Sequence, residues 1–401
     1  MHNFASRPRL ALRLIALFLS LTLISLLIEH LNVVIENSTL STIAQVFVLT
    51  LFCTGFLLWY GEAGRRLKLR IFFRGIGFDD YCKHLPKYRG KERVNQYLVK
   101  ITFRSLIHEG YWMKAQKELE MYFGKKIHKI ACLHENIRIV EIYVIHKDLP
   151  KLIKWHDSYL TYDKKLFPIG EGFEGQVLWD LKTDPHGLIA GATSAGKTNL
   201  LRLILNTAIR RGFETIVFDF KAGGDFSFFG DIIISEPKEA LDALRLLLAE
   251  VRNRMTKFRE SKVTNVDEYN TLGQDELHRF LLVIDEAAEV FDVKPKEKDE
   301  KELYLEIDKI MRTLARMSRA AGVHMLFGMI RPDANVLDGQ IKNNLSLRAC
   351  GHFSDPAASR IVLDSDKATD LPTDVKGRFI IDDEEVQTYF LTIAGSEKSN
   401  S

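Results

Sequence analysis

The segment from Gly191 to Thr198 constrains this chain more than any other, because its sequence, GATSAGKT, matches G-x-x-x-x-G-K-[ST] at every specified position. In that pattern, backbone N–H groups turn toward phosphates, and the N-terminus of the following helix adds partial positive charge. An apolar run, 187–190, precedes the segment, and an apolar stretch, 199–211, follows it with helical spacing. This order of strand, loop and helix disfavours a chance match in a glycine-rich turn. We therefore expect a site for a nucleoside triphosphate, ATP.

Each residue of the loop has an expected contact with the nucleotide. Lys197 is expected to reach the β- and γ-phosphates, and the Thr198 hydroxyl is expected to bind Mg²⁺. The complete set of expected nucleotide-binding residues is Gly191, Ala192, Thr193, Ser194, Ala195, Gly196, Lys197 and Thr198.

A second motif, FLLVIDE at 280–286, ends an apolar strand with two carboxylates. We expect Asp285 to belong to the Mg²⁺ shell and Glu286 to align and polarise the attacking water. The alternative is a strand that merely ends in acidic residues, and the preceding GATSAGKT loop makes this the weaker interpretation. The expected chemistry is hydrolysis of ATP, with Lys197 and Glu286 as catalytic residues.

Composition limits the class of protein. The 401 residues are 46% hydrophobic, which is enough for a large folded core, and the net charge of +3 excludes a chain built to coat nucleic acid along its whole length. The four cysteines lie far apart, and the histidines show no H-E-x-x-H spacing. We expect neither disulfides nor structural zinc.

Two apolar runs, 10–28 and 43–60, are long enough to cross a bilayer, and the second ends in the aromatic pair Trp59 and Tyr60. The loop between them carries only the acidic residues Glu29 and Glu36, whereas the outer flanks are basic. We therefore predict a two-span hairpin in the cell membrane with both termini cytoplasmic. A cleaved signal peptide is the alternative, and the absence of a small-x-small site after residue 28 argues against it. The basic flanking residues are Arg7, Arg9, Arg13, Arg65, Arg66, Lys68, Arg70 and Arg74.

Alternating strand-like and helix-like segments after residue 167 predict an α/β fold with a largely parallel sheet covered on both faces. Before it, 94–123 has helical spacing with a break near Gly110, and 129–145 alternates like a hairpin, which together suggest a small α+β domain. We interpret 293–301 as a solvated loop and 302–321 as a helix. The expected domains are 1–74, the membrane hairpin; 75–166, the small domain; 167–395, the ATPase; and 396–401, a tail.

Six ordered blocks between 167 and 393 resemble the successive motifs of the FtsK/SpoIIIE motor ATPases. They are PHGLIAGATSAGKT, FDFKAGGDF, FLLVIDEAAEVF, ARMSRAAGVHM, RPDANVLDGQIKNNLSLR and SRIVLD. The resemblance implies a P-loop NTPase of RecA-like fold and a membrane-anchored ring, usually a hexamer, that translocates DNA. It also suggests Arg360, in SRIVLD, as a residue that acts on a neighbouring subunit's nucleotide, with Arg319 and Arg331 as weaker candidates.

One pair of adjacent positions departs from the family pattern. Where the family usually has T-Q-R-P, this chain has Met329 and Ile330 before Arg331, so a polar pair expected to sense the γ-phosphate is apolar here. Asn343 or Asn344 is a candidate for the missing amide. The coupling of hydrolysis to movement is the property that this change puts in question.

The printed sequence has no segment like the winged-helix domain with which chromosome-segregating members read DNA. The expected order of two membrane spans, a small domain and an ATPase domain resembles the coupling proteins of conjugative elements, of the TcpA type. The implied partners are DNA, other copies of the chain, a relaxase and proteins of a transfer channel. The alternatives are a chromosome-segregation translocase, a protein-secretion ATPase and a nucleotide-dependent scaffold, and the sequence leaves the strand state of the DNA open.

Overall fold

The computed structural model describes residues 29–30, 42–43, 46–47, 49–50, 62–81, 84–133, 138–221, 224–273, 275–333, 336 and 339–392. The first expected membrane span, 10–28, and the tail, 396–401, lie outside these residues, as does most of the second span, 43–60. No helix within the described ranges has the length and apolar character needed to cross a membrane. The chain divides into two compact units, one ending at Val144 and the other holding residues 95–98 and 145–401.

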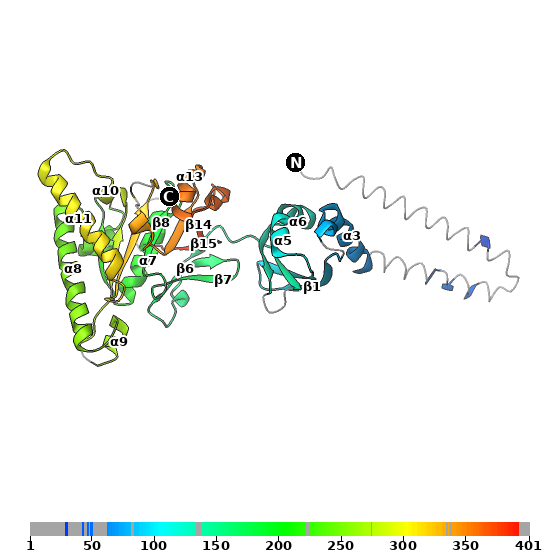
Figure 1. Ribbon diagram of the computed structural model, residues 1–401, viewed down its shortest axis with the longest axis horizontal. Helices are drawn as coiled ribbons and strands as arrows, with labels where there is room; N and C mark the ends of the chain where they lie inside the picture. Colours follow the sequence, from blue (N-terminus) through cyan, green and yellow to red (C-terminus); the bar gives the residue numbers. More distant parts are fainter. Residues whose placement is uncertain are drawn as a thin grey trace. The chain divides into compact units, whose positions relative to one another are not determined.

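In its described residues from 62 onward, the smaller unit combines four helices with one sheet of order β1-β2-β4-β3 (Figure 1). Its aromatic core includes Phe73, Phe103 and Trp112, all fully buried. The strands are β1 (Lys87–Arg93), β2 (Leu98–Arg104), β3 (Ile127–Cys132) and β4 (Ile139–Ile145). The helices are α3 (Glu62–Gly75), α4 (Phe78–Tyr81), α5 (Glu109–Lys114) and α6 (Gln116–Phe123).

The expectation of helix from 94 is wrong, because β2 occupies 98–104 and the helices begin only at Glu109. In β2 the more buried side chains alternate with less buried ones, and Ile101 and Phe103 point into the core. The apolar spacing of this short segment fits both periods, and pairing with β1 selects the strand. The hairpin at 129–145 is confirmed, since β3 and β4 pair antiparallel from Ile127 to Cys132.

The larger unit is built on one sheet whose order is β10-β9-β11-β12-β8-β13-β14-β15-β6-β7, with β5 added beside β15. Strands β10 through β13 in this order pair parallel, and the remaining neighbours on the main path pair antiparallel. The parallel strands are β8 (His186–Ala190), β9 (Glu214–Phe218), β10 (Ile233–Ile234), β11 (Phe280–Ile284), β12 (Val323–Met329) and β13 (Leu347–Gly351). The others are β5 (Ile153–Lys154), β6 (Leu166–Gly172), β7 (Gly175–Asp180), β14 (Arg378–Ile381) and β15 (Glu384–Phe390).

Helices cover both faces of this sheet, as predicted. On one face, α7 (Lys197–Arg210) packs Leu200 and Ile204 against Ile189 and Val283. On the other, α8 (Pro237–Glu260) and α11 (Lys298–Met317) lie side by side over the alternate strand residues (Figure 1). The shorter elements are α9 (Val266–Asn270), α10 (Ala288–Phe291), α12 (Gly339–Lys342), α13 (Pro356–Leu363), η2 (Asp157–Tyr159), η3 (Ser227–Ile232) and η4 (Lys367–Asp370).

Two boundaries differ from the sequence expectations. Helix α11 begins at Lys298, inside the segment interpreted as a loop, because Asp299 and Glu300 favour the positive end of a helix while staying solvated. Residues 145–166 group with the larger unit rather than with the small domain, since β5 pairs with the C-terminal strand β15.

Candidate active site

The loop between β8 and α7 has the conformation that its glycines allow. Ser194 has a φ of 73° and Gly196 a φ of 105°. A side chain at Gly196 would also place its Cβ 2.8 Å from the Gly377 nitrogen, which donates a hydrogen bond to the Ala195 carbonyl. Gly196 is therefore required both for its backbone angle and for the close approach of the turn before β14.

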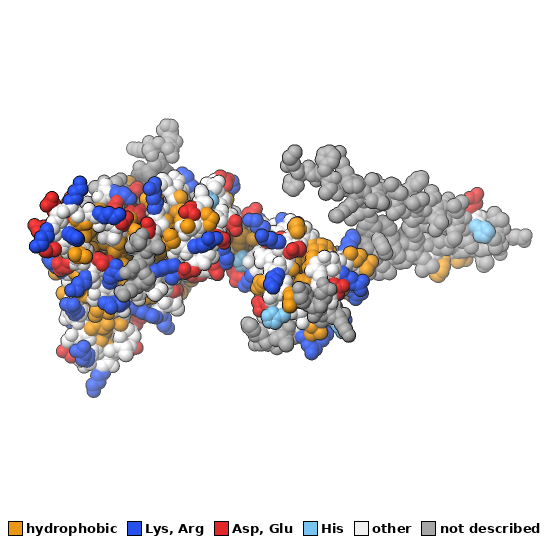
Figure 2. Space-filling model, turned by 45° about the horizontal axis from the view of Figure 1, so that its top comes forward, with side chains coloured by type: hydrophobic (Ala, Val, Ile, Leu, Met, Phe, Trp, Pro, Cys, Tyr) orange, Lys and Arg blue, Asp and Glu red, His pale blue; other side chains and the backbone are white. Residues whose placement is uncertain are grey.

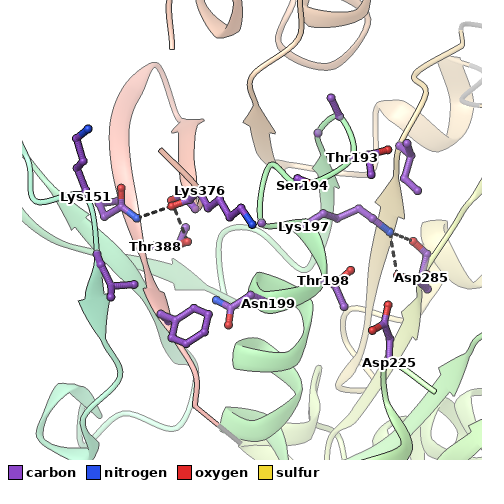
Figure 3. A pocket seen from close by; sticks show the side chains of 18 of the residues that line it. Lys151, Thr193, Ser194, Lys197, Thr198, Asn199, Asp225, Asp285, Lys376 and Thr388 are labelled. Atoms are coloured by element: carbon purple, nitrogen blue, oxygen red, sulfur yellow. Dashed lines mark hydrogen bonds and ion pairs between the residues drawn. The ribbon is translucent and has the colours of Figure 1, made fainter. Parts of the chain in front are cut away.

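Lys197 extends across the sheet edge to Asp285 at the end of β11 (Figure 3). Its Nζ lies 2.9 Å from the Asp285 Oδ1 and also donates to the Asp285 carbonyl oxygen. The two side chains are only 6% and 11% exposed, so each charge is shielded from water and depends on the other. The structure thus brings together the two residues that the sequence assigns to phosphate and Mg²⁺.

Gly328, near the end of the neighbouring strand β12, makes this approach possible. A Cβ at Gly328 would lie 2.1 Å from the Asp285 carbonyl oxygen and 3.0 Å from the Lys197 Nζ. The carbonyl of Gly328 accepts from the Ala287 N–H, which fixes the turn after Asp285. No local sequence pattern marks this glycine, because the neighbouring strand that crowds it is far away in sequence.

Glu286 is buried beside this pair, and its carboxylate oxygens accept from the backbone N–H of Ile330 at 3.1 and 3.2 Å. Burial raises the pKa of this carboxyl above its usual range, whereas nearby Lys197, the Ile330 N–H and Lys221 counteract the rise. A partly desolvated carboxylate with few partners is a suitable base for orienting a water molecule.

Met329 and Ile330, the apolar pair that departs from the family pattern, have different environments. Met329 is fully buried in the core, whereas Ile330 lines the nucleotide cavity and contacts Glu286 through its backbone. The backbone N–H exists whatever the side chain, so the contact to Glu286 survives the loss of a polar residue. Asn343 and Asn344 are not among the residues that line the cavity.

Two charged residues of the segment after β9 also line the cavity. Lys221 lies 3.2 Å from the Glu289 carboxylate and 3.8 Å from that of Glu286, while Asp225 pairs with Arg202 at 2.7 Å. Both belong to the FDFKAGGDF block, which is the signal that could have identified them.

The cavity has a volume of about 490 Å³ and extends from the loop to β15 (Figure 3). Beyond the phosphate loop its wall carries Leu152 and Phe390, which are 54% and 44% exposed. Apolar side chains left exposed in a cavity wall are suited to the flat face of a nucleotide base. Polar groups of the same wall come from Lys151, Asn199, Lys376, Gln387 and Thr388.

The expected Mg²⁺ ligands suit that ion. Thr198 and Asp285 both line the cavity and supply hydroxyl and carboxylate oxygens. In the described part of the chain, no group of three or more His, Cys, Asp or Glu side chains could hold a metal. Mg²⁺ commonly binds through one or two protein ligands together with phosphate oxygens and water, so two donors are sufficient.

The three candidate arginines lie away from this cavity. Arg360, on α13, is 62% exposed and lies 3.3 Å from the Asp366 carboxylate of the same chain. Arg319 donates to the Lys182 carbonyl, and Arg331 is exposed just after β12. Within one subunit, therefore, none of these three arginines lines the cavity where the γ-phosphate is expected.

Comparisons with known proteins identify the family to which the chain is similar. The FtsK/SpoIIIE family model matches residues 153–334. The DNA translocase FtsK of Clostridium tetani is 30% identical over 321 residues, which are 67% of this chain and 42% of that protein. The FtsK of Campylobacter jejuni serotype O:23/36 is 31% identical over 46% of this chain and 20% of its own length. The chain thus spans less than half the length of these relatives.

A solved structure matches over more of the chain. It is the pCW3 conjugation coupling protein TcpA in a monomer form with ATPγS, 33% identical with a TM-score of 0.61. The match covers 82% of this chain and 95% of that one. This coverage exceeds the larger unit alone and so includes part of the smaller unit.

Proposed function

This chain belongs to the FtsK/SpoIIIE family and is a P-loop ATPase, and from that premise we propose that it is a membrane-anchored motor that moves DNA into a conjugative transfer channel. The observation that carries the proposal is the likeness to TcpA, because it extends beyond the ATPase unit and covers nearly all of that protein.

The site suggests how hydrolysis would proceed. Nucleotide phosphates entering the loop would offer Lys197 a new anionic partner, so the buried ammonium would exchange Asp285 for phosphate without becoming unpaired. Thr198 and the released Asp285 would hold Mg²⁺, which neutralises developing phosphate charge when it is bound. Glu286, kept in place by the Ile330 N–H, would orient the attacking water.

The site also suggests assembly into a ring, which we propose to be a hexamer. Charge that develops on the transferred phosphoryl group is commonly stabilised by an arginine, and Arg360 would supply it to a neighbour's site. Its present partner, Asp366, is as exposed as Arg360 itself, and exposed ion pairs contribute little. Arg360 can therefore leave Asp366 at small cost.

Mixing variants tests the shared site. Arg360→Ala should bind ATP but hydrolyse it slowly. Activity should return when it is mixed with Lys197→Ala/Asp285→Asn subunits, which lack a working site but keep Arg360 and leave no buried carboxylate unpaired. Asp366→Asn is the control, because it breaks the same ion pair and keeps the arginine, so its hydrolysis should remain normal. Absence of complementation at every ratio, with rings still assembled, would contradict an arginine acting in trans.

We propose a cell-membrane location with both termini in the cytoplasm, supported by the two apolar runs and their basic flanks. Cysteine substitution at Ser38 should then be labelled by an impermeant reagent in intact cells, whereas substitution at Ser396 should be labelled only after lysis. The unsubstituted chain gives the background of the native cysteines. Labelling at Ser396 with Ser38 protected would overturn this topology.

Chromosome segregation is the second candidate function, favoured by the identity to FtsK proteins. A protein-secretion ATPase remains the alternative with a polypeptide substrate. DNA-stimulated ATP hydrolysis would support either DNA motor and exclude the secretion ATPase. A relaxase or other transfer protein that co-purifies with the full chain would separate conjugative transfer from segregation.

A further inference from the structure

A hollow on the smaller unit has four cationic side chains among its seven lining residues. Its volume is about 360 Å³, and it is lined by Leu69, Arg70, Pro86, Lys87, Tyr88, Arg89 and Arg104. Among the residues that the structure describes, no carboxylate borders it. None of its four cationic side chains forms an ion pair with any residue that the structure describes. On the larger unit, by contrast, acidic and basic side chains are interspersed over the visible face (Figure 2).

Two of these cations oppose each other in the sheet. Lys87 of β1 and Arg104 of β2 are directly paired residues in the antiparallel register. Like charges in that position repel and destabilise a strand pair. Arg89, at the register shift of β1, adds a third charge to the same hollow. This arrangement raises the energy of the free protein and would be relieved by a bound anion.

Helix α3, which contributes Leu69 and Arg70 to the hollow, also exposes apolar side chains. Leu67 and Ile71 are 46% and 63% exposed, and together with Arg70 and Arg74 they occupy helix positions that share one face. Exposed apolar residues flanked by cations are typical of helices that lie at a bilayer surface. The helix begins just after Trp59 and Tyr60, the end of the second apolar run.

We propose that this hollow binds the phosphate headgroup of an anionic phospholipid, a role that rests on the membrane attachment proposed above. Basic residues set the orientation of a membrane span only when they lie within about 15–20 residues of its end. Lys87, Arg89 and Arg104 lie beyond that distance, so orientation of the span does not account for them. A compact hollow also suits one headgroup better than a nucleic-acid backbone, which needs an extended basic track.

The test uses the full chain in a neutral detergent, with bound lipid measured by native mass spectrometry. Dioctanoyl phosphatidylglycerol should bind in preference to dioctanoyl phosphatidylcholine. The variant Lys87→Gln/Arg104→Gln should weaken phosphatidylglycerol binding roughly thirty-fold, because each basic residue near an anionic surface is worth about 1 kcal/mol, a factor of about five. The control Lys117→Gln/Lys126→Gln removes equal charge from exposed positions outside the hollow and should leave binding unchanged.

Thermal unfolding separates binding from folding. Removing the Lys87–Arg104 repulsion should leave the melting temperature unchanged or higher, although lipid binding falls. If that variant is unstable, Arg89→Gln tests the same hollow at an exposed position and should also weaken lipid binding. ATP hydrolysis should persist in all these variants, so that failure here is distinct from failure of the motor function.

Three results would overturn the inference. The first is equal binding of the two lipids, and the second is an equal loss of binding in the control variant. The third is binding of a 20-base-pair duplex that depends on Lys87 and Arg104 while lipid binding does not, which would assign the hollow to DNA.

Discussion

Replacement of Glu286 by glutamine separates hydrolysis from every other property of the site. Glutamine has the same shape and can still accept the Ile330 N–H with its carbonyl oxygen, but it cannot polarise water as a carboxylate does. Loss of a positioned base typically lowers the rate by about 10²- to 10⁴-fold, or about 3–5 kcal/mol of activation free energy. We expect phosphate release to fall within this range.

Nucleotide binding and stability should respond differently. The carboxylate of Glu286 hydrogen-bonds the Ile330 N–H and pairs with Lys221 rather than with the phosphate loop, so affinity for a fluorescent ATP analogue should be retained. Burial raises the pKa of this carboxyl, which means that its ionised form is disfavoured in the folded protein at neutral pH. The neutral amide removes that cost, and the melting temperature should not decrease.

Glu289→Gln is the matched control. Glu289 lies one helical turn further along the chain and shares Lys221 with Glu286, but the Ile330 N–H contacts only Glu286. This control should keep most of the hydrolytic rate. Near-normal phosphate release by Glu286→Gln, or loss of ATP binding in that variant, would refute the assigned role.

Three further predictions concern the neighbours of Glu286. Lys197→Ala should abolish ATP binding. It should also destabilise the protein by about 3–5 kcal/mol, because Asp285 stays buried without its cation, and adding Asp285→Asn should restore much of the melting temperature. Gly328→Ala should lower both melting temperature and activity, because its Cβ would overlap the Asp285 carbonyl. Lys221→Gln removes a charge that lowers the pKa of Glu286, so the acid limb of the pH–rate profile should move to higher pH.

Each of these has a contrary outcome. An unchanged melting temperature for Lys197→Ala would mean that the buried pair is not formed in solution. Full activity of Gly328→Ala would show that the strand end is looser than the structure indicates. A shift of the acid limb to lower pH would contradict the interaction between Lys221 and Glu286.

The phosphate loop and the strand-end carboxylates were predictable because each is a local pattern whose geometry follows from a few consecutive residues. The far wall of the cavity was not, since Leu152 and Phe390 come from opposite ends of the larger unit and meet only through pairing of β5 with β15. The role of Ile330 was missed for another reason. Sequence patterns describe side chains, whereas its contact to Glu286 is made by the backbone.

Secondary structure was predictable where segments are long and strongly periodic, as in α8. It was not predictable at 98–104, where seven residues fit either period and the neighbouring strand decides. The charged start of α11 shows the converse, because solvated residues that contribute nothing to a core can still form the first turn of a helix.

The central claim, that ATP hydrolysis by this chain moves DNA, is tested most directly by triplex displacement. The full chain is added to a duplex carrying a labelled third strand, and release of that strand is followed with ATP present. We expect ATP-dependent release by the unaltered chain and none by Glu286→Gln, which still binds nucleotide. Hydrolysis that proceeds without stimulation by DNA and without displacing the third strand would contradict the claim.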